Sequence, residues 1–435
     1  MPEPAASAAT GVPGGDGGGS GQGSAGGEAA ERRRALVAEL RRRGHLRNDR
    51  VATAFAAVPR ELFVADHARR HGLAAVYQDE AIVTRRDPAT GEPTSSSSQP
   101  AIMARMLEML DPAPGARVLE IGAGTGYNAA LLAHLVGDHG AVTSVELAPS
   151  VAAGARRALL AAGSPARVVV GDGRRGWADA APVDAVIATA STETIARPWF
   201  DQLRSGGRLV VPLRLSPVVF GLQAVVAVRK VRHGFDPVAV TPGGFMALRD
   251  PDPAVPAAAA DGVTADEEAD RDRRPLVHLA GPALAGLGAA ARRRLLVTAL
   301  GFGRGGPLDL GDAPTSALLA YATLALPEER LVAVTRPDDG ARSRQALGVV
   351  DADGSLALLV VDAAGARWQA HGGRGAEAAV RSAADRWVRA GRPGVGDLAV
   401  TVRYGAERPH AWRSVRRGDQ WVALDWVPDT SGGRT

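Results

Sequence analysis

The chain contains 435 residues, of which 46% are hydrophobic and 23% charged, with 51 basic side chains against 47 acidic ones. It has no cysteine, which excludes a disulfide scaffold, a cysteine nucleophile and an iron–sulfur cluster. The net charge of only +4 is no signature of nucleic-acid binding, and no apolar run approaches the roughly 20 residues that span a bilayer. Because the N-terminus also lacks the pattern of a secretory signal, we expect a cytoplasmic protein of about two or three domains, with no nucleic-acid or membrane partner.

The N-terminal half contains the more regular pattern. Residues 1–28 are mostly small or polar and predict a disordered tail. Two helices are then predicted, over 30–40 and 51–58. Further along, short apolar runs alternate with helical stretches; strands are predicted at 118–121, 141–146, 167–170, 184–188 and 208–213, and helices at 129–136 and 150–162. This alternation predicts an α/β fold with a doubly wound, mostly parallel sheet, and 218–231 with 238–240 predict an antiparallel hairpin at its edge.

The C-terminal half lacks a recognisable catalytic motif. Residues 249–275 combine prolines, alanines and an acidic run, which predicts a linker between a catalytic domain at 29–248 and a smaller α+β domain at 276–430. We predict that this second domain serves peptide recognition. For its strand at 398–404 the favoured interpretation is an ordinary core strand, and the alternative is an edge that binds an extended peptide. A dimerisation or stabilising role is the alternative.

A glycine-rich loop lies between the first predicted strand and its helix. It reads Glu120-Ile-Gly-Ala-Gly-Thr-Gly-Tyr127, with glycines at 122, 124 and 126 that let the backbone turn tightly and approach a ligand. The dinucleotide-binding pattern G-x-G-x-x-G, counted from Gly122 and Gly124, requires its last glycine at position 127, where this chain has Tyr127. The loop therefore favours a nucleoside without a pyrophosphate. Glu146 ends the next strand, where a carboxylate can accept hydrogen bonds from both ribose hydroxyls. The alternative is a tight turn followed by a surface glutamate.

A run of serines precedes a predicted amphipathic helix at 101–110. The run reads Thr94-Ser-Ser-Ser-Ser-Gln-Pro100. Most serine runs are solvated linkers, and that is one reading here. The other is a functional loop, because the run leads directly into the helix with no further linker character.

Several motifs together resemble one enzyme family. Residues 118–132 resemble motif I of S-adenosylmethionine-dependent methyltransferases and, more narrowly, are similar to the protein-L-isoaspartate O-methyltransferase family. Supporting segments are 43–46 with 58–64, the Ser98-Gln99-Pro100 sequence, and 171–177 with 181–184. Two positions depart from the family pattern: Ser96 stands where a threonine is usual, and Val183 where the family has an aromatic residue. The resemblance covers residues 40–245.

The resemblance implies a Rossmann-like methyltransferase fold and S-adenosylmethionine as the cofactor. The cofactor-binding residues it implies are Glu120, Gly122, Gly124, Gly126, Tyr127, Asn128, Glu146, Leu147, Asp172 and Gly173, with Asp172 accepting from the adenine amino group. It also implies Ser98 as the hydroxyl that contacts the substrate carboxylate, with Ser96, Ser97 and Gln99 beside it. Methyl transfer to a carboxylate needs no general base, because the acceptor is already ionised at neutral pH. No metal site is expected.

The loop before the serine run is longer than in housekeeping members of the family. Residues 84–93, the added C-terminal unit and 243–246 resemble the branch encoded in ribosomal-peptide modification clusters of the FxLD and lanthipeptide type. This branch implies a precursor peptide as substrate, with Asp and isoAsp both open as the acceptor. The alternatives are a housekeeping repair methyltransferase and a non-catalytic module that recruits a peptide. A DNA amino-methyltransferase is set aside, because 188–191 reads Ala-Thr-Ala-Ser where such enzymes carry a proline motif.

Overall fold

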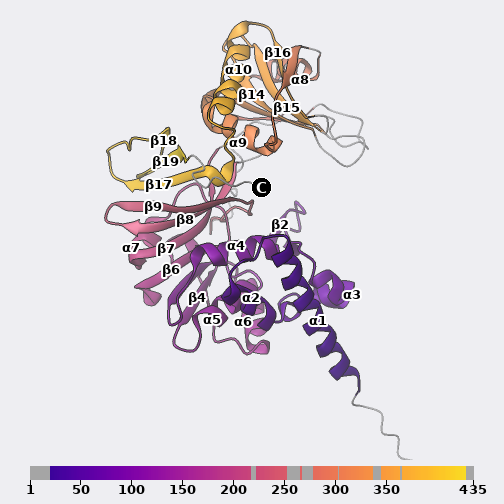
Figure 1. Ribbon diagram of the computed structural model, residues 1–435, viewed down its shortest axis with the longest axis vertical. Helices are drawn as coiled ribbons and strands as arrows, with labels where there is room; N and C mark the ends of the chain where they lie inside the picture. Colours follow the sequence, from indigo (N-terminus) through magenta and orange to yellow (C-terminus); the bar gives the residue numbers. More distant parts are fainter. Residues whose placement is uncertain are drawn as a thin grey trace, which may run out of the picture.

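The structure is a computed structural model of the chain (Figure 1). It describes residues 20–216, 222–251, 265–266, 278–301, 303–336, 344–362 and 365–427. Within these residues the strands form a two-stranded, a seven-stranded and a ten-stranded sheet. Short 3-10 helices occur at η1 (Arg60–Leu62), η2 (Gly173–Arg175), η3 (Ala178–Ala180), η4 (Pro282–Leu284), η5 (Glu328–Arg330) and η6 (Val395–Asp397).

Three N-terminal helices precede the sheets: α1 (Ser20–Arg42), α2 (Asp49–Ala57) and α3 (Ala65–Val76). The side chain of Asn48 caps α2 by accepting the N–H groups of Arg50 and Val51. Helix α1 begins within the predicted tail, so the prediction of disorder was wrong for residues 20–28. Ala29 is buried and the Glu28 carboxylate pairs with Arg32 at 3.5 Å, which favours helix at this point. Residues 1–19 lie outside the described residues.

The ten-stranded sheet carries the predicted α/β fold. Its strands are β3 (Arg117–Ile121), β4 (Ala141–Glu146), β5 (Arg167–Val170), β6 (Val183–Ala188), β7 (Leu203–Arg214), β8 (Gln223–Val231), β9 (Gly234–Pro242), β17 (Leu398–Tyr404), β18 (Arg413–Arg417) and β19 (Gln420–Trp426), in the order β18-β19-β17-β9-β8-β7-β6-β3-β4-β5. Strands β3 to β7 pair in parallel, and β8 and β9 form the predicted antiparallel hairpin. The doubly wound Rossmann-like fold is therefore confirmed, although residues 218–221 of the predicted hairpin lie outside the described part.

Helices cover both faces of this sheet. Along β6, Ala185 and Ile187 face a core shared with α4 (Pro100–Leu110), α5 (Tyr127–Val136) and α6 (Pro149–Ala161). The alternate residues Val186 and Ala188 face a second core that contains α7 (Arg197–Gln202). This alternation is the two-residue period of a strand buried on both sides. The loops that follow β3, β4, β5 and β6 meet at the carboxyl edge of the parallel strands, where ligands bind in such folds.

The seven-stranded sheet belongs to the C-terminal half and is antiparallel. Its order is β10-β11-β13-β14-β15-β16-β12, with β10 (Ala265–Asp266), β11 (His278–Ala280), β12 (Arg304–Leu308), β13 (Leu331–Arg336), β14 (Arg344–Val350), β15 (Leu356–Asp362) and β16 (Gly365–His371). Helices α9 (Thr315–Ala325) and α10 (Arg374–Arg389) share one core with it, and α8 (Ala289–Leu300) shares the other. Most of the predicted linker lies outside the described residues.

The last three strands return to the first half of the chain. Figure 1 shows β17, β18 and β19 beside β9, below the seven-stranded sheet. Strand β17 pairs with β19 along its length and with β9 through Val402 and Arg403. The predicted division at 276–430 therefore differs from the observed sheets, since residues 398–426 extend the catalytic sheet. The favoured interpretation of 398–404 as an ordinary core strand is confirmed, because β17 lies between β19 and β9; the alternative of a free edge is wrong.

Candidate active site

The glycine loop turns at the carboxyl end of β3 and leads into α5. Gly122, Gly124 and Gly126 all have positive φ values, of +94°, +52° and +89°. A Cβ atom at Gly122 would lie 2.5 Å from Oγ1 of Thr189, and one at Gly126 would lie 3.3 Å from the Cβ of Ala155. Both the backbone conformation and the close packing therefore require glycine here.

Glu146 ends β4 directly beside this loop. Its Oε2 accepts the N–H of Gly124 at 3.0 Å, and its Oε1 accepts the N–H of Ala148 at 3.1 Å. The carboxylate is largely buried, at 7% exposure, and Leu147 beside it is half-buried. Each carboxylate oxygen keeps a further acceptor position. The structure thus brings the predicted ribose acceptor and the predicted glycine loop together.

Three other predicted cofactor residues lie inside the protein. Glu120 has no exposed surface; it accepts a 2.7 Å hydrogen bond from Nδ2 of Asn128 and another from the hydroxyl of Ser144. Tyr127 is buried against Phe55 and Phe63, with ring centroids 6.2 and 5.5 Å away. These side chains support the glycine loop from the interior. The family resemblance implied them as cofactor residues, and a motif match does not indicate which face of a strand or helix a side chain occupies.

The buried position of Glu120 changes the pKa of its carboxyl group. It raises the pKa of this carboxyl from an ordinary 4.5 to about 7, against the hydrogen bonds from Ser144 and Asn128, which lower it. The folded protein therefore holds the proton of this carboxyl more tightly than the unfolded chain does. The free energy of unfolding consequently falls as the pH rises from 4.5 to about 7, because the unfolded chain ionises first.

The variant Glu120→Gln tests this. A glutamine retains an acceptor for Asn128 and can donate to Ser144, but it does not titrate. We expect the variant to gain stability over the unaltered protein as the pH rises through that window, by up to about 3 kcal/mol above pH 7. Chemical denaturation across the pH range measures the difference. Stability curves that stay parallel from pH 4 to 8 would show that Glu120 ionises normally.

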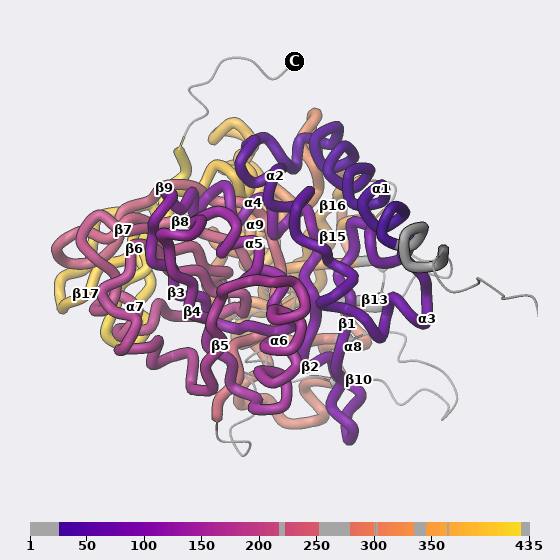
Figure 2. Tube along the Cα trace, turned by 90° about the horizontal axis from the view of Figure 1, so that it is seen from below, coloured from indigo at the N-terminus to yellow at the C-terminus, as the bar shows by residue number. Residues whose placement is uncertain are grey.

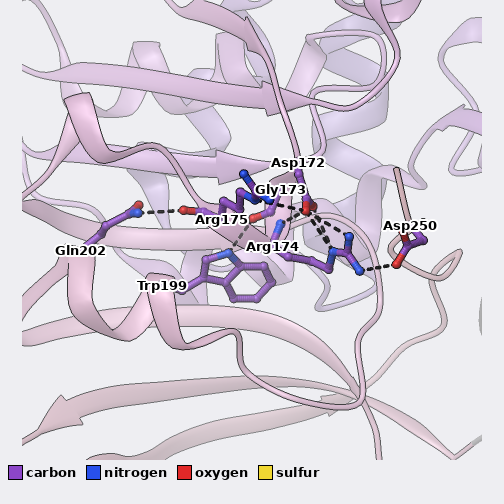
Figure 3. A network of polar contacts seen from close by, with 7 residues as sticks. All are labelled: Asp172, Gly173, Arg174, Arg175, Trp199, Gln202 and Asp250. Atoms are coloured by element: carbon purple, nitrogen blue, oxygen red, sulfur yellow. Dashed lines mark hydrogen bonds and ion pairs between the residues drawn. The ribbon is translucent and has the colours of Figure 1, made fainter. Parts of the chain in front are cut away.

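Asp172 and Gly173 follow β5, the strand next to β4, and lie at the same carboxyl edge of the sheet as Glu146 (Figure 3). The Asp172 carboxylate accepts the backbone N–H of Arg174 at 3.0 Å and pairs with its guanidinium, 3.1 Å away. The same guanidinium also reaches Asp250. Gly173 has no room for a side chain, since a Cβ would lie 2.6 Å from Cγ2 of Ile121. The Arg174 pair with Asp250 was not anticipated, because nothing in the local sequence links the two positions.

The serine run forms one strand of a hairpin that crosses the glycine loop. The hairpin consists of β1 (Ile82–Arg86) and β2 (Pro93–Ser97). The carbonyl oxygen of Ser96 lies 3.2 Å from the position that a Cβ on Gly124 would occupy. The Ser97 hydroxyl is buried and has no hydrogen-bond partner within the described part of the chain, whereas Ser98 is half-buried. The predicted substrate loop and the predicted cofactor loop are therefore in contact, which a solvated linker would not be.

Arg60 holds this loop and was missed by the sequence prediction. Its side chain has no exposed surface, and its guanidinium donates to the carbonyl oxygens of Val76, Gln78, Glu80 and Ser98 at 2.8 to 3.2 Å. Burial lowers the pKa of Arg60. A buried cation that bonds four backbone carbonyls joins both ends of the hairpin to the N-terminal helices. The only available signal was an arginine in the segment 58–64, which the family resemblance includes.

Asp79 fixes the other side of the loop. Its Oδ1 accepts the N–H of Ala101 at 2.8 Å, at the start of α4, and the side-chain amide of Gln99 donates to its Oδ2 at 3.1 Å. The Gln99 amide also donates to the backbone oxygen of Asp79 at 3.0 Å. Gln99, predicted to contact substrate, is thus engaged in holding the loop.

The far part of the hairpin reaches α6. Nη1 of Arg85, on β1, donates to the Ser150 hydroxyl of α6 at 2.7 Å, close in sequence to Glu146. In the view of Figure 2 the labels of the hairpin and of α6 fall in the same part of the molecule. Among the described residues, neither Arg85 nor Arg86 has a carboxylate partner; Arg86 donates to the Gly91 carbonyl instead. The hairpin therefore covers the glycine loop and presents two cations without paired anions.

Two absences apply to the part of the chain that the structure describes. It contains no group of three or more His, Asp or Glu side chains that could hold a metal ion. None of the helices in these residues combines the length and apolarity needed to cross a membrane.

Comparison with known proteins identifies the family. A sequence model of the protein-L-isoaspartate(D-aspartate) O-methyltransferase family matches residues 31–235. The protein-L-isoaspartate O-methyltransferase of Hyperthermus butylicus is 40% identical over 228 residues, covering 50% of this chain and 88% of the relative. That of Ignicoccus hospitalis is 35% identical over 219 residues, covering 50% of this chain and 97% of the relative. A solved structure of a protein-L-isoaspartate O-methyltransferase aligns with a TM-score of 0.49 and 23% identity, covering 91% of this chain and 99% of its own. The family model and the two sequence relatives confirm the resemblance seen in the motifs: the chain belongs to the protein-L-isoaspartate(D-aspartate) O-methyltransferase family, and it is an S-adenosylmethionine-dependent methyltransferase.

Proposed function

We propose that this chain methylates the carboxylate of an aspartyl or isoaspartyl residue in a peptide. The observation that carries the proposal is the contact between two loops: the Ser96 carbonyl lies against Gly124, so the serine loop borders the glycine loop of the cofactor site. A carboxyl acceptor bound at the serine loop would then lie beside the cofactor. Methyl transfer is an in-line displacement, which requires such a juxtaposition at about 3 Å.

The residues at the sheet edge fit S-adenosylmethionine. Two carboxylates end neighbouring strands, Glu146 after β4 and Asp172 after β5, and the N-terminus of α5 offers backbone N–H groups. We assign Glu146 to the ribose hydroxyls through its remaining acceptor positions, and Asp172 with Gly173 to the adenine. When bound, the cofactor supplies an electrophilic methyl group on its sulfonium. The protein's own task is to orient the two reactants and exclude water.

Ser98 is the residue that we assign to the acceptor. An ionised carboxylate is costly to bury unless donors meet it, and a serine hydroxyl is such a donor. Arg60 holds the Ser98 carbonyl at 3.2 Å, which fixes the backbone at this position. The product is a methyl ester, in which the carboxylate oxygen has formed a bond to the methyl carbon and the carbon–sulfur bond has broken. The following backbone amide can attack the ester, release methanol and close a succinimide.

The preferred acceptor, in our proposal, lies in an acidic precursor peptide. The support is the long hairpin, because neither Arg85 nor Arg86 forms an ion pair with a carboxylate among the described residues. Cations at the rim of a site attract acidic partners and hasten their association. A housekeeping repair role is the alternative, and it would not require this hairpin.

One pair of peptides tests both parts of this proposal. The first is a short neutral isoaspartyl peptide, and the second carries the same acceptor with an acidic extension. With labelled S-adenosylmethionine, we expect both to form a base-labile methyl ester, and the acidic peptide to show a KM lower by roughly fivefold. Equal KM values would favour the repair role. Peptide binding without any methyl ester would indicate the non-catalytic recruiting module and contradict the proposed function.

A further inference from the structure

We propose that the C-terminal strands β17 and β19 hold the adenine side of the cofactor site in place through α7, with Gln420 and Tyr404 as positioning residues. This inference rests on the proposed assignment of Asp172 and Gly173 to the adenine. Both positioning residues lie well beyond residues 31–235, the part of the chain matched by the family model. Three consecutive sets of contacts connect them to the site.

The first set joins β17 and β19 to the loop after β6. The Gln420 side chain is 1% exposed, and its amide bonds both backbone groups of Ile195. Its Oε1 accepts the Ile195 N–H at 3.1 Å, and its Nε2 donates to the Ile195 carbonyl at 3.0 Å. The Tyr404 hydroxyl donates to the same carbonyl at 3.1 Å. One residue of the loop is thus held by three hydrogen bonds from the C-terminal strands.

The second set joins the same strands to α7, which begins two residues after Ile195. The ring of Phe200 packs edge-on against Tyr404, with centroids 5.0 Å apart, and against Phe235 at 5.4 Å. The Arg197 guanidinium lies over the Tyr404 ring, 5.0 Å from its centroid. Such aromatic and cation–π contacts fix the orientation of a short helix that makes few hydrogen bonds of its own.

The third set joins α7 to the turn of Asp172 and Gly173, as Figure 3 shows. Trp199 is fully buried, and its Nε1 donates to the Gly173 carbonyl at 2.7 Å. Gln202 bonds the same turn twice: its Nε2 donates to the Arg175 carbonyl and its Oε1 accepts the Trp177 N–H, both at 2.8 Å. The position of α7 therefore sets the position of the turn.

The loop of Ile195 also reaches the glycine loop. Thr189 is the first residue of this loop after β6, and its Oγ1 donates to the Gly122 carbonyl at 2.6 Å. A shift of the loop of Ile195 would consequently displace Gly122 as well as Gly173. Removal of Gln420 would leave the N–H of Ile195 without a partner in a buried place, and the loop would have to move to regain one.

The variant Gln420→Ala in the full chain tests the inference. We expect the Kd for S-adenosylhomocysteine and the KM for S-adenosylmethionine to rise together by roughly 3- to 10-fold. The KM for the isoaspartyl peptide and kcat should change little, because the serine loop lies on other elements. The matched control is Gln369→Ala, on β16 of the seven-stranded sheet. The Gln369 side chain bonds the Gly301 carbonyl at the end of α8, and its removal should leave all four constants unchanged.

A second variant covers the case in which Gln420→Ala does not fold. Tyr404→Phe removes only the hydroxyl and should raise the Kd for S-adenosylhomocysteine by about two- to threefold. If folded variants bind S-adenosylhomocysteine as tightly as the unaltered protein and lose only thermal stability, the strands are merely structural and the inference is overturned. If the unaltered protein itself does not bind S-adenosylhomocysteine, the proposed function fails, which is a different result.

Discussion

Ser98→Ala is expected to lower kcat for methyl transfer by roughly 10²-fold, the loss expected when the acceptor carboxylate is no longer held in line with the methyl group. The Kd for S-adenosylmethionine should stay within about twofold, since the hydroxyl is assigned to the acceptor and not to the nucleoside. Among the described residues this hydroxyl makes no hydrogen bond, and the side chain is only half-buried. The substitution therefore removes nothing on which the fold depends.

The matched control for this experiment is Ser95→Ala. Ser95 lies on the same strand, but its hydroxyl is buried and accepts from Thr84 at 3.1 Å. It should cost some stability and leave kcat nearly unchanged. Steady-state kinetics with an isoaspartyl peptide and calorimetric titration of the cofactor separate the possible results. A joint loss of kcat and cofactor affinity in Ser98→Ala would place the hydroxyl at the cofactor, and no loss at all would make the serine run a simple connection.

Arg60→Met is expected to have the largest effect on stability. It removes the donors to four buried carbonyl groups while keeping most of the side-chain volume. Breaking a buried charged network of this kind costs about 3–5 kcal/mol of the free energy of unfolding. Because two of the carbonyls belong to Glu80 and Ser98, on either side of the hairpin, kcat/KM should also fall by at least about tenfold.

Arg50→Met is the comparison for this variant. Arg50 also donates to two backbone carbonyls, those of Pro112 and Leu135, but its side chain is 42% exposed and it lies away from the serine loop. We expect a smaller loss of stability and unchanged kinetics for the folded protein. Chemical denaturation and kinetics on both variants give the answer. Equal losses in the two variants would show that Arg60 has no special relation to the serine loop.

Local patterns predicted much of the catalytic sheet. The bounds of β4 and β5 match the predicted strands, because each is a short apolar run flanked by turn residues. The glycine loop and Glu146 were singled out for a related reason, since each belongs to a short local pattern at the end of a predicted strand, whereas Asp172 was implied by the family resemblance. The structure then places all three at one edge of the sheet, as parallel strands require.

The contacts that local patterns could not show join distant parts of the chain. Gln420 and Ile195 are 225 residues apart, and no periodicity indicates that β17 would pair with β9 as well as with β19. The role of Arg60 could not be predicted, because the sequence does not distinguish a buried arginine from a surface one. Tyr127 was assigned to the cofactor from its place in the motif, whereas α5 turns its ring into the core.

A structure of the full chain with S-adenosylhomocysteine bound tests the central claim most directly. The account expects the ribose hydroxyls within hydrogen-bonding distance of the Glu146 carboxylate, the adenine beside Asp172 and Gly173, and the sulfur facing the loop of Ser98. It also expects Asp172 to keep its acceptor position for the adenine amino group while still paired with Arg174. A nucleoside bound away from Glu146, or a sulfur that faces away from the serine loop, would contradict it.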